Sequence, residues 1–491
     1  MIKEVVALSN DRTGYHPHPG EKAYGHRITS LSEGWKELCA QYLPLIPTNS
    51  IWRYSRQRSS ADPAQGWKLH LSATVLTANQ LIEKVAPFLC GLDVLFKAPS
   101  SLHELGKINS GLHYGFSQVG KVITVYPQSP REAVTLAGKL HQLTYGLPAP
   151  KIPFDIQFQR NSCIYYRYGG FVSVEMEDEG GNRVSVVRNA EGKLVPDLRG
   201  PGKSVPVWVA DPFPRKNRRR KQARVIGSLL RTTFRAYKTI SQRGKGGVYR
   251  ALDLSLGTQR FCVLKEGRPH GETDWEGRDG CWRIRHEEHV LSCLSNEGIR
   301  VPAVYASFEV EGHRYLVTEF IEGDNLHSLL LNRKKKLPIT EALRYGIQLA
   351  ELLSGIHAAG WAWRDCKPLN LIVAEGGLLR PVDFEGACRV DAPDPAPWGT
   401  QAYMPPEQRG SLAAESCVTQ DLYALGVTLH QLFSGQVPDP SKRLAPVGSL
   451  RRGVPPTVRK LIAVLLQPQL RPNAQTVFEK LRGAYAGLAQ D

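Results

Sequence analysis

Two short segments of the C-terminal half concentrate residues that are able to move a phosphoryl group. The first is WRDCKPLNLIV at 363–373 and the second is PVDFEGA at 381–387. Transfer of a γ-phosphoryl group needs a carboxylate at the acceptor hydroxyl, a cation beside the moving phosphate, and a carboxylate plus an amide that hold divalent ions. The residues expected to meet these needs are, in that order, Asp365, Lys367, Asp383 and Asn370. A turn rich in capping residues would explain any one of them but not the full spacing.

The elements around these segments change character along the chain. Strand-like runs fall around 237–265 and 303–320, with a helical pattern near 281–294 between them. The chain then becomes mainly helical, and the run ALRYGIQLAELLSGIHAAG, whose apolar residues recur at three- and four-residue spacing, leads into the first segment. The pattern predicts a small β-rich lobe followed by a larger helical lobe.

This half of the chain, over roughly 235–485, resembles the protein kinase superfamily. The resemblance implies that Lys265 in RFCVLKEG pairs with the nucleotide phosphates and that Glu287 anchors this lysine, with the adjacent Glu288 as an alternative. It also places Asp421 of QDLYALG beneath the catalytic loop, and WGTQAYMPPEQ at the close of the activation region. The implied cofactors are ATP, or another nucleoside triphosphate, and Mg²⁺.

Three positions depart from the usual kinase pattern. The histidine before the catalytic-loop arginine is Trp363, and the glycine after Asp-Phe is Glu385. The nucleotide loop reads SQRGKGGVYR at 241–250, where Gly246 and Val248 align with the expected pattern and are expected to contact the nucleotide. None of these changes removes a group that contacts phosphate or metal. They favour an unusual kinase over the loss of phosphoryl transfer.

The N-terminal half shows a different alternation of elements. Strand-like and helical patterns succeed one another along it, which indicates a mixed α+β domain. The strand-like runs lie at 66–73, 93–99, 121–127 and 162–171, and the helical stretches at 77–89 and 130–143.

Several of these strand-like runs carry lysine. Lys68 and His70 are two residues apart in GWKLHLSAT and would therefore point to the same face of a strand, while Lys97 and Lys121 belong to two further runs. A face with several lysines and a histidine but no carboxylate partner suits a dianionic substrate. A solvated strand face with snorkelling lysines is the alternative that spacing leaves open.

The segments GWKLHLSAT, LFKAP and GKVITVYP are similar to the lyase domain of class III and class IV lanthipeptide synthetases, which is itself related to bacterial phosphothreonine lyases. The run KEGRPHGETDWEGRDGCWRIRHE at 265–287 resembles the kinase domain of the same family. The resemblance implies phosphorylation of Ser and Thr in a precursor peptide that carries a leader. Elimination of the phosphate would then leave dehydroalanine or dehydrobutyrine.

The resemblance also implies a role for individual residues of the N-terminal half. Lys97 would remove the Cα proton, with its pKa lowered by Lys68 and other cations. Lys68 would stabilise the enolate-like charge, and His70 would protonate the departing phosphate. The residues expected to bind the phosphate are Lys121, Arg167 and Arg131.

The expected fold class is α+β, with a phosphothreonine-lyase-like domain at 1–210 and a two-lobed kinase-like domain at 225–491. Between them lies the basic linker 211–224, DPFPRKNRRRKQAR, because such a block of like charges resists packing. The cyclase domain of full-length family members is expected to be missing, as in the truncated lipolanthine-type kinase–lyases. That likeness implies a flavin-dependent decarboxylase or a separate cyclisation partner.

Composition limits the other possibilities. The chain has 491 residues and a net charge of +17, which favours anionic partners such as phosphate groups, acidic peptides or nucleic acid. No apolar run approaches the roughly 18 residues that a membrane span needs. Nine cysteines without a CxxC pair indicate a reduced, cytoplasmic protein.

Two other functions remain open at the level of sequence. One is a Ser/Thr kinase whose N-terminal half binds substrate without catalysis. The other is a kinase that associates with nucleic acid through the basic block, although this block lacks the interleaved aromatic residues of such sites. We expect no specific nucleic-acid partner.

Overall fold

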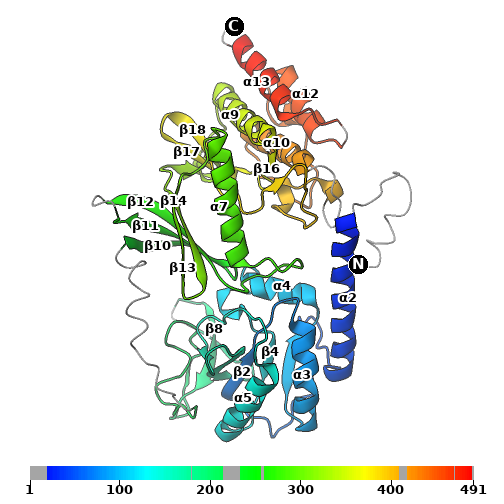
Figure 1. The fold of residues 1–491 in the computed structure, drawn as a ribbon, viewed down its shortest axis with the longest axis vertical. Coiled ribbons are helices and arrows are strands. Elements are labelled where there is room, and N and C mark those ends of the chain that lie inside the picture. The colour runs from blue at the N-terminus through cyan, green and yellow to red at the C-terminus, as the bar shows by residue number, and fades with distance from the viewer. Residues whose placement is uncertain are drawn as a thin grey trace.

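The computed structural model describes residues 19–178, 180–213, 233–255, 259–408, 417–468 and 470–488. The N-terminal elements form one α+β body, and a two-lobed body follows it in the chain, as Figure 1 shows from blue to red. The expected α+β class is confirmed. Residues 214–224 of the expected basic linker lie outside the described residues.

A six-stranded antiparallel sheet is the centre of the N-terminal body. Its strand order is β1-β3-β4-β2-β6-β5. One face is apolar and packs under helices, through residues such as Leu69, Val125 and Phe96. The opposite face carries the residues of chemical interest, because side chains alternate along a strand. The strands are β1 (Trp52–Tyr54), β2 (Gln65–Leu71), β3 (Phe96–Pro99), β4 (Ile123–Val125), β5 (Ile156–Gln157) and β6 (Ile164–Gly170).

In the described part of the N-terminal body, four helices pack around the apolar core of this sheet, and two of them begin with the same cap. In α4 (Leu102–Ser110) and α5 (Pro130–Thr144), a serine just before the helix accepts a hydrogen bond from the amide of a glutamate three residues later. α3 (Ala78–Gly91) and α5 bury their apolar faces on the sheet. α2 (Pro19–Tyr42) packs against α3 and α4.

A small three-stranded sheet extends from the N-terminal body. It comprises β7 (Glu175–Glu177), β8 (Arg183–Arg188) and β9 (Leu194–Pro196). The segment after β9 returns toward the six-stranded sheet and brings Asp197 to Arg167 of β6.

The first lobe of the C-terminal body is a five-stranded antiparallel sheet of order β10-β11-β12-β14-β13 with one helix, α7 (Gly280–Asn296), against it. Its strands are β10 (Phe234–Gln242), β11 (Gly246–Asp253), β12 (Arg260–Gly267), β13 (Val304–Val310) and β14 (His313–Glu319). This is the β-rich lobe that the sequence predicts.

The second lobe is mainly helical and shares a large apolar core. Two small sheets carry its loops: β15 (Asp324–Asn325) with β17 (Leu371–Ala374) and β18 (Leu378–Pro381), and β16 (Trp361–Ala362) with β19 (Cys388–Arg389). α9 and α10 lie at the centre of the core. The helices are α8 (Leu326–Asn332), α9 (Ile339–Ala358), α10 (Cys417–Ser434), α11 (Val447–Leu450), α12 (Pro456–Leu465) and α13 (Ala474–Leu488).

Helix α4 lies where the two bodies meet (Figure 1). At its C-terminal end the carbonyl of Ser110 accepts a hydrogen bond of 3.0 Å from the amide of Gly244, in the loop between β10 and β11. The neighbouring Asn109 is buried and binds two backbone groups of its own domain, the carbonyl of Ala73 and the amide of Gly120, each at 3.1 Å. The two bodies are therefore in direct contact at this helix end.

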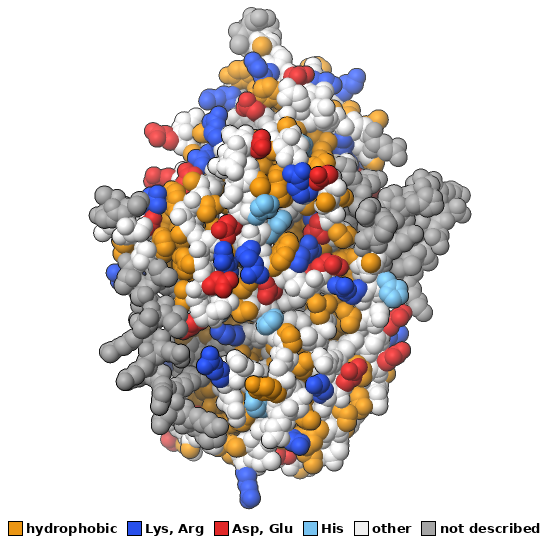
Figure 2. Space-filling view, in the orientation of Figure 1, with side chains coloured by type: hydrophobic (Ala, Val, Ile, Leu, Met, Phe, Trp, Pro, Cys, Tyr) orange, Lys and Arg blue, Asp and Glu red, His pale blue; other side chains and the backbone are white. Residues whose placement is uncertain are grey.

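Charged side chains of both signs are interspersed over the middle of the face in Figure 2. The Lys and Arg residues of the described part of this face form no single continuous patch there. Among the described residues, no helix is both long and apolar enough to span a membrane.

Candidate active sites

The strand register of the N-terminal sheet aligns the predicted lyase residues in one cross-strand row. Lys97 of β3 and His70 of β2 both pair with Thr124 of the intervening β4. The row extends to Tyr54 on one side and Tyr165 on the other. Directly paired residues of an antiparallel sheet share a face, so these side chains stand together.

His70 is held by a carboxylate that the sequence did not reveal. Its Nδ1 lies 2.6 Å from Oδ2 of Asp155, and Oδ1 of Asp155 lies 3.3 Å from Nζ of Lys121. All three side chains are buried. Burial opposes the charge on Asp155, but His70 and Lys121 outweigh it and hold the pKa of Asp155 at about 2.

An ionised Asp155 fixes the tautomer of the neutral His70 ring. The carboxylate accepts the proton on Nδ1, which leaves Nε2 as the nitrogen for a substrate. Burial lowers the pKa of His70 to about 3, so its ring is neutral at pH 7 before substrate binds. A phosphate dianion beside the ring would supply the negative charge that favours the imidazolium.

Lys97 has the environment that a lysine base needs. Burial, followed by the charges of Arg199 and Lys121, lowers its pKa to about 8. Its ammonium lies 4.1 Å from the ring centre of Trp52 and 5.9 Å from that of Tyr54. Burial is thus the first cause of the shift, ahead of the crowding by cations that the sequence suggested.

Lys68 and Arg167 form the next pair of the same face, since they are register partners in β2 and β6. Burial, and then Arg167, lowers the pKa of Lys68 to about 7. The buried Arg167 donates from Nη2 to Oδ1 of Asp197 at 2.5 Å. Arg199 follows Asp197 by two residues and lowers the pKa values of Lys68, Lys97 and Lys121.

Two expectations about this face are corrected by the structure. The expectation that it has no carboxylate partner is wrong, because Asp155 and Asp197 both enter it from segments outside the recognised strands. Arg131 does not join the cluster: it is exposed in the first turn of α5, on the helix that covers the apolar face. Arg199 is a third residue of the site that the sequence did not single out.

In the kinase-like body, the predicted Lys265–Glu287 pair is formed. Nζ of Lys265 lies 2.6 Å from Oε1 of Glu287, which also accepts the amide of Phe384 at 3.0 Å. Burial opposes the charge on Lys265, but Glu287 and Asp383 outweigh it and raise its pKa. Glu288 points elsewhere and binds Ser307 and Arg314, so Glu287 is the partner of Lys265.

The catalytic-loop residues converge on the carboxylate of Asp365. Oδ2 of Asp365 accepts from Nζ of Lys367 at 2.6 Å and from Nδ2 of Asn370 at 2.8 Å. Its Oδ1 accepts from the hydroxyl of Thr400 at 3.2 Å, and Lys367 also donates to Thr400 at 2.7 Å. Thr400 belongs to the recognised WGTQAYMPPEQ segment but was not singled out.

Trp363 takes over a structural task at the position where kinases usually have histidine. Its indole Nε1 donates to the carbonyl of Asp383 at 2.9 Å, and its ring stacks on Phe384 with a centroid distance of 5.2 Å. The fully buried Asp421 accepts the amides of Trp363 at 2.8 Å and Arg364 at 2.7 Å. The substitution therefore preserves the link between the two segments.

A cavity of about 700 Å³ is lined by Lys265, Asp365, Lys367, Asn370 and Asp383, together with Gly246, Val248 and residues of α4. Lys265, Lys245 and other cations outweigh the effect of burial and lower the pKa of Asp383. Asn370 uses its amide nitrogen toward Asp365, which leaves its oxygen for a cation. A carboxylate and an amide oxygen are hard donors that suit a magnesium-like ion, so the residues present fit a metal–nucleotide complex.

The other departure from the kinase pattern, Glu385, also has a partner. Its Oε1 pairs with Nζ of Lys245, which comes from the loop between β10 and β11. Burial lowers the pKa of Lys245 to about 8, although Asp383 and Glu272 act in the opposite direction.

The activation segment is held by a carboxylate between two arginines. Asp394 lies 2.6 Å from Arg278 and 3.3 Å from Arg364, whose Nη2 also donates to the carbonyl of Ala396 at 2.5 Å. Arg278 belongs to the family-specific run that the sequence identified. In regulated kinases a phosphorylated side chain often makes such contacts with arginine; here an aspartate of the chain makes them.

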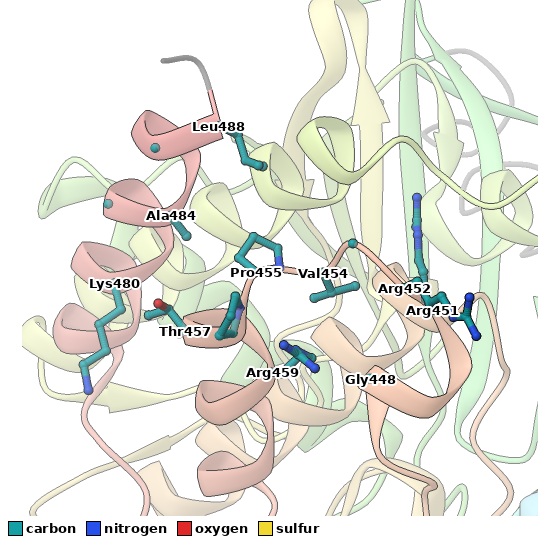
Figure 3. Close-up of a pocket in the computed structure, with 14 residues that line it drawn as sticks. Gly448, Arg451, Arg452, Val454, Pro455, Thr457, Arg459, Lys480, Ala484 and Leu488 are labelled. Carbon is teal, nitrogen blue, oxygen red and sulfur yellow. The ribbon is translucent and has the colours of Figure 1, made fainter. Parts of the chain in front are cut away.

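A separate cavity of about 870 Å³ lies between the loop before α12 and helix α13. Arg452, Arg459 and Lys480 are among the residues around it (Figure 3). It shares no lining residue with the cavity at Asp365.

Known proteins are similar to both parts of the chain. The family model described as RamC, N-terminal domain matches residues 46–225, and the model described as Protein kinase domain matches residues 235–469. A protein named Probable SapB synthase from Streptomyces coelicolor is 30% identical over 438 residues, which are 86% of this chain and 44% of that protein.

Other relatives match the kinase part. Serine/threonine-protein kinase PknA of Mycobacterium tuberculosis is 31% identical over 260 residues, covering 49% of this chain and 58% of the kinase. Serine/threonine-protein kinase F of Synechocystis sp. is 32% identical over 227 residues, covering 42% of this chain and 45% of that protein. The chain thus spans about half the length of these relatives. A protein kinase domain implies ATP and a divalent metal ion. The chain therefore carries an N-terminal domain of the RamC family followed by a domain of the protein kinase family.

Proposed function

We propose that the chain dehydrates Ser and Thr residues of a ribosomally made precursor peptide in two steps, as lanthipeptide synthetases do. The kinase domain phosphorylates the hydroxyl with ATP and Mg²⁺, and the N-terminal domain eliminates the phosphate. One observation carries the proposal: a single chain holds a kinase constellation around Asp365 and a separate buried basic cluster around Lys97. Both are complementary to phosphate.

In the first step, Asp365 would accept the proton of the substrate hydroxyl as its oxygen attacks the γ-phosphorus. Lys367 lies beside that carboxylate and would neutralise charge on the transferred group. Asp383 and Asn370 would hold the divalent ion, which shields the negative charge of the phosphates. Lys265, fixed by Glu287, would bind the phosphates of the nucleotide.

In the second step, the neutral amine of Lys97 would take the Cα proton of the phosphorylated residue. The Cα–H electrons then form the carbon–carbon double bond while the Cβ–O bond to phosphate breaks. Lys68 would stabilise the charge on the carbonyl oxygen. His70 would take a proton from solvent onto Nε2 when the phosphorylated residue binds, and would give that proton to the departing phosphate. Lys121 and Arg167 would bind that phosphate, with Arg199 as a further cation at the same face.

The test is mass spectrometry of a precursor peptide with a leader, incubated with the full chain and ATP. We expect wild type to yield peptide that has lost water, Lys97→Ala to accumulate phosphopeptide, and Asp365→Ala to leave the peptide unmodified. Phosphopeptide that is stable in the presence of wild type would instead support a kinase whose N-terminal domain only binds substrate. Dehydration by Lys97→Ala at the wild-type rate would refute the assignment of the base.

Ring closure lies outside these two steps. A separate cyclisation partner and a flavin-dependent decarboxylase stay predictions from the sequence resemblance.

A further inference from the structure

The loop between β10 and β11 carries a lysine at a place where kinases bring backbone over the nucleotide phosphates. The side chain of Lys245 enters the cavity that Asp365, Asn370 and Asp383 line, and it pairs there with Glu385. Only 23% of the Lys245 side chain and 13% of the Glu385 side chain are exposed. The charge of Lys245 also acts on the carboxylate of Asp383.

The backbone of this loop is fixed on two sides. On the side of the N-terminal domain, the amide of Gly244 donates to the carbonyl of Ser110 at 3.0 Å. On the kinase side, the amide of Arg268 donates to the carbonyl of Lys245 at 2.8 Å, and the Arg268 guanidinium donates to the carbonyl of Arg243 at 3.0 Å. The backbone that carries Lys245 is therefore held by contacts from both domains.

Neither of these two contacts leaves room for a side chain on the glycine that makes it or faces it. A Cβ at Gly244 would overlap the carbonyl oxygen of Asn109, and a Cβ at Gly280 would overlap the carbonyl oxygen of Lys245. Two glycines at these positions allow the close approach of three backbone segments.

We propose that Lys245 is a phosphate-contacting cation of the kinase site, that Glu385 is its counter-ion before nucleotide binds, and that the N-terminal domain positions it through Gly244. The inference rests on the proposed kinase step and deepens it. The ligand is the polyphosphate of a nucleoside triphosphate, bound with a divalent ion.

The pairing accounts together for two departures from the kinase motifs. A lysine buried beside the catalytic groups needs an anion, and a glutamate in place of the glycine after Asp-Phe supplies it. A triphosphate carries more negative charge than one carboxylate, so it would compete successfully for the ammonium. Glu385, two residues after Asp383, would then be without its lysine partner and would add negative charge near the residues that would hold the divalent ion.

Nucleotide affinity distinguishes phosphate binding by Lys245 from a pair with Glu385 that only holds the loop in place, which we call a latch. We would titrate the full chain with a non-hydrolysable ATP analogue and Mg²⁺ by calorimetry. Lys245→Ala should weaken binding about tenfold or more, as expected for the loss of a charge-assisted contact, and Lys245→Arg should retain most of the affinity. Glu385→Gln should bind as tightly as wild type or more tightly, because the competing anion is removed. If Lys245→Ala bound with wild-type or higher affinity, the pair would be a latch and the proposal would be overturned.

A second variant tests whether the N-terminal domain positions the loop through Gly244. Gly244→Ala should displace the loop and weaken nucleotide binding in the same direction as Lys245→Ala. The matched control is Gly138→Ala in α5, where an added Cβ meets nothing within 4 Å. Elimination from a peptide that is already phosphorylated reports whether each variant is folded. Wild-type affinity in Gly244→Ala would refute the positioning role.

The two proposals fail in different ways. Nucleotide binding needs no peptide, so a chain that binds the analogue but modifies no precursor would refute the dehydration function and leave Lys245 assigned. Dehydration of the precursor by wild type, together with wild-type nucleotide affinity in Lys245→Ala, would support the dehydration function and refute the role of Lys245.

Discussion

The buried carboxylate of Asp155 organises the cations of the N-terminal site. It contacts His70 and Lys121. His70 belongs to the same cross-strand row of the sheet as Lys97. Without its charge, the His70 ring would no longer be held in the tautomer that leaves Nε2 for the substrate.

Asp155→Asn should therefore slow elimination about ten- to a hundredfold, which is part of the roughly 10²–10⁴ that general acid–base catalysis supplies. The measurement is the rate of phosphate release from a phosphorylated peptide. Asp93→Asn, at a carboxylate whose side chain is 86% exposed, is the control and should behave as wild type. A structural role alone would reduce stability but leave the pH profile of the remaining activity unchanged, and that result would contradict the assignment.

The pKa of Lys97 predicts the pH dependence of elimination. A base must be neutral to accept a proton, and with a pKa of about 8 about one Lys97 in ten is neutral at pH 7. Lys68 must stay charged to stabilise the carbonyl oxygen, and its pKa is lowered to about 7. The rate at low substrate should therefore rise as Lys97 becomes neutral, pass through a maximum between about pH 7 and 8, and then fall as Lys68 loses its proton. Stopped assays between pH 6 and 9 would show this maximum; a rate that falls steadily from pH 6 upward would exclude lysine as the base.

Only some residues of the N-terminal site could be predicted from the sequence. Lys68, His70 and Lys97 lie in strands with clear patterns, and their alternation predicts a shared face. Asp155 and Asp197 could not be assigned in the same way, because each lies beside a short or irregular element and is brought to the sheet by tertiary packing.

At the scale of elements, the activation segment is fixed by Asp394 between Arg278 and Arg364. Asp394→Asn should loosen the segment and lower the rate of peptide phosphorylation about tenfold, the worth of one charge-assisted contact. Radiolabelled phosphate transfer to the peptide would measure it, in a background of Lys97→Ala so that phosphopeptide accumulates.

Asp391→Asn provides the matched control for the Asp394 variant. Asp391 lies three residues earlier and pairs with Arg389, but its side chain is 70% exposed. Its removal should leave the rate unchanged. Equal losses in both variants would mean that general charge of the segment, and not the Asp394 contacts, matters.

Sequence patterns located most elements that position the sites, including β2, β6, α5, α7 and α9, but two helices escaped them. α4 has nine residues with a glycine inside, too short for a clear periodicity, although Ser101 and Glu104 form a recognisable helix start. α2 has 24 residues, and buried side chains such as Tyr24, Trp35 and Cys39 are spread thinly along it, which weakens the apolar stripe of the helix.

At the scale of the whole molecule, both proposed sites belong to one chain. This affects how the phosphorylated peptide passes from the kinase site to the elimination site. A mixture of Lys97→Ala and Asp365→Ala contains one intact site of each kind on different molecules. The phosphopeptide must then leave one chain and find another, which is slower than rebinding to the same chain at an effective concentration of about a millimolar.

We therefore expect the mixture to restore dehydration, but more slowly than wild type at micromolar enzyme, with a rate that increases with concentration. Time courses by mass spectrometry at two enzyme concentrations would measure this. No dehydrated product at any concentration would show that the intermediate never reaches another chain, contrary to the expectation.

The contact between the domains was beyond the reach of sequence, because Gly244 and Ser110 are far apart in the chain and have no pattern in common. Its geometry has a practical consequence for engineering. The side chain of Asn109 hydrogen-bonds to the backbone of Ala73 and Gly120 in the N-terminal domain, so the end of α4 makes contacts in both domains. Hybrid enzymes that join the halves of two relatives would need to keep this helix end and its facing loop from the same parent.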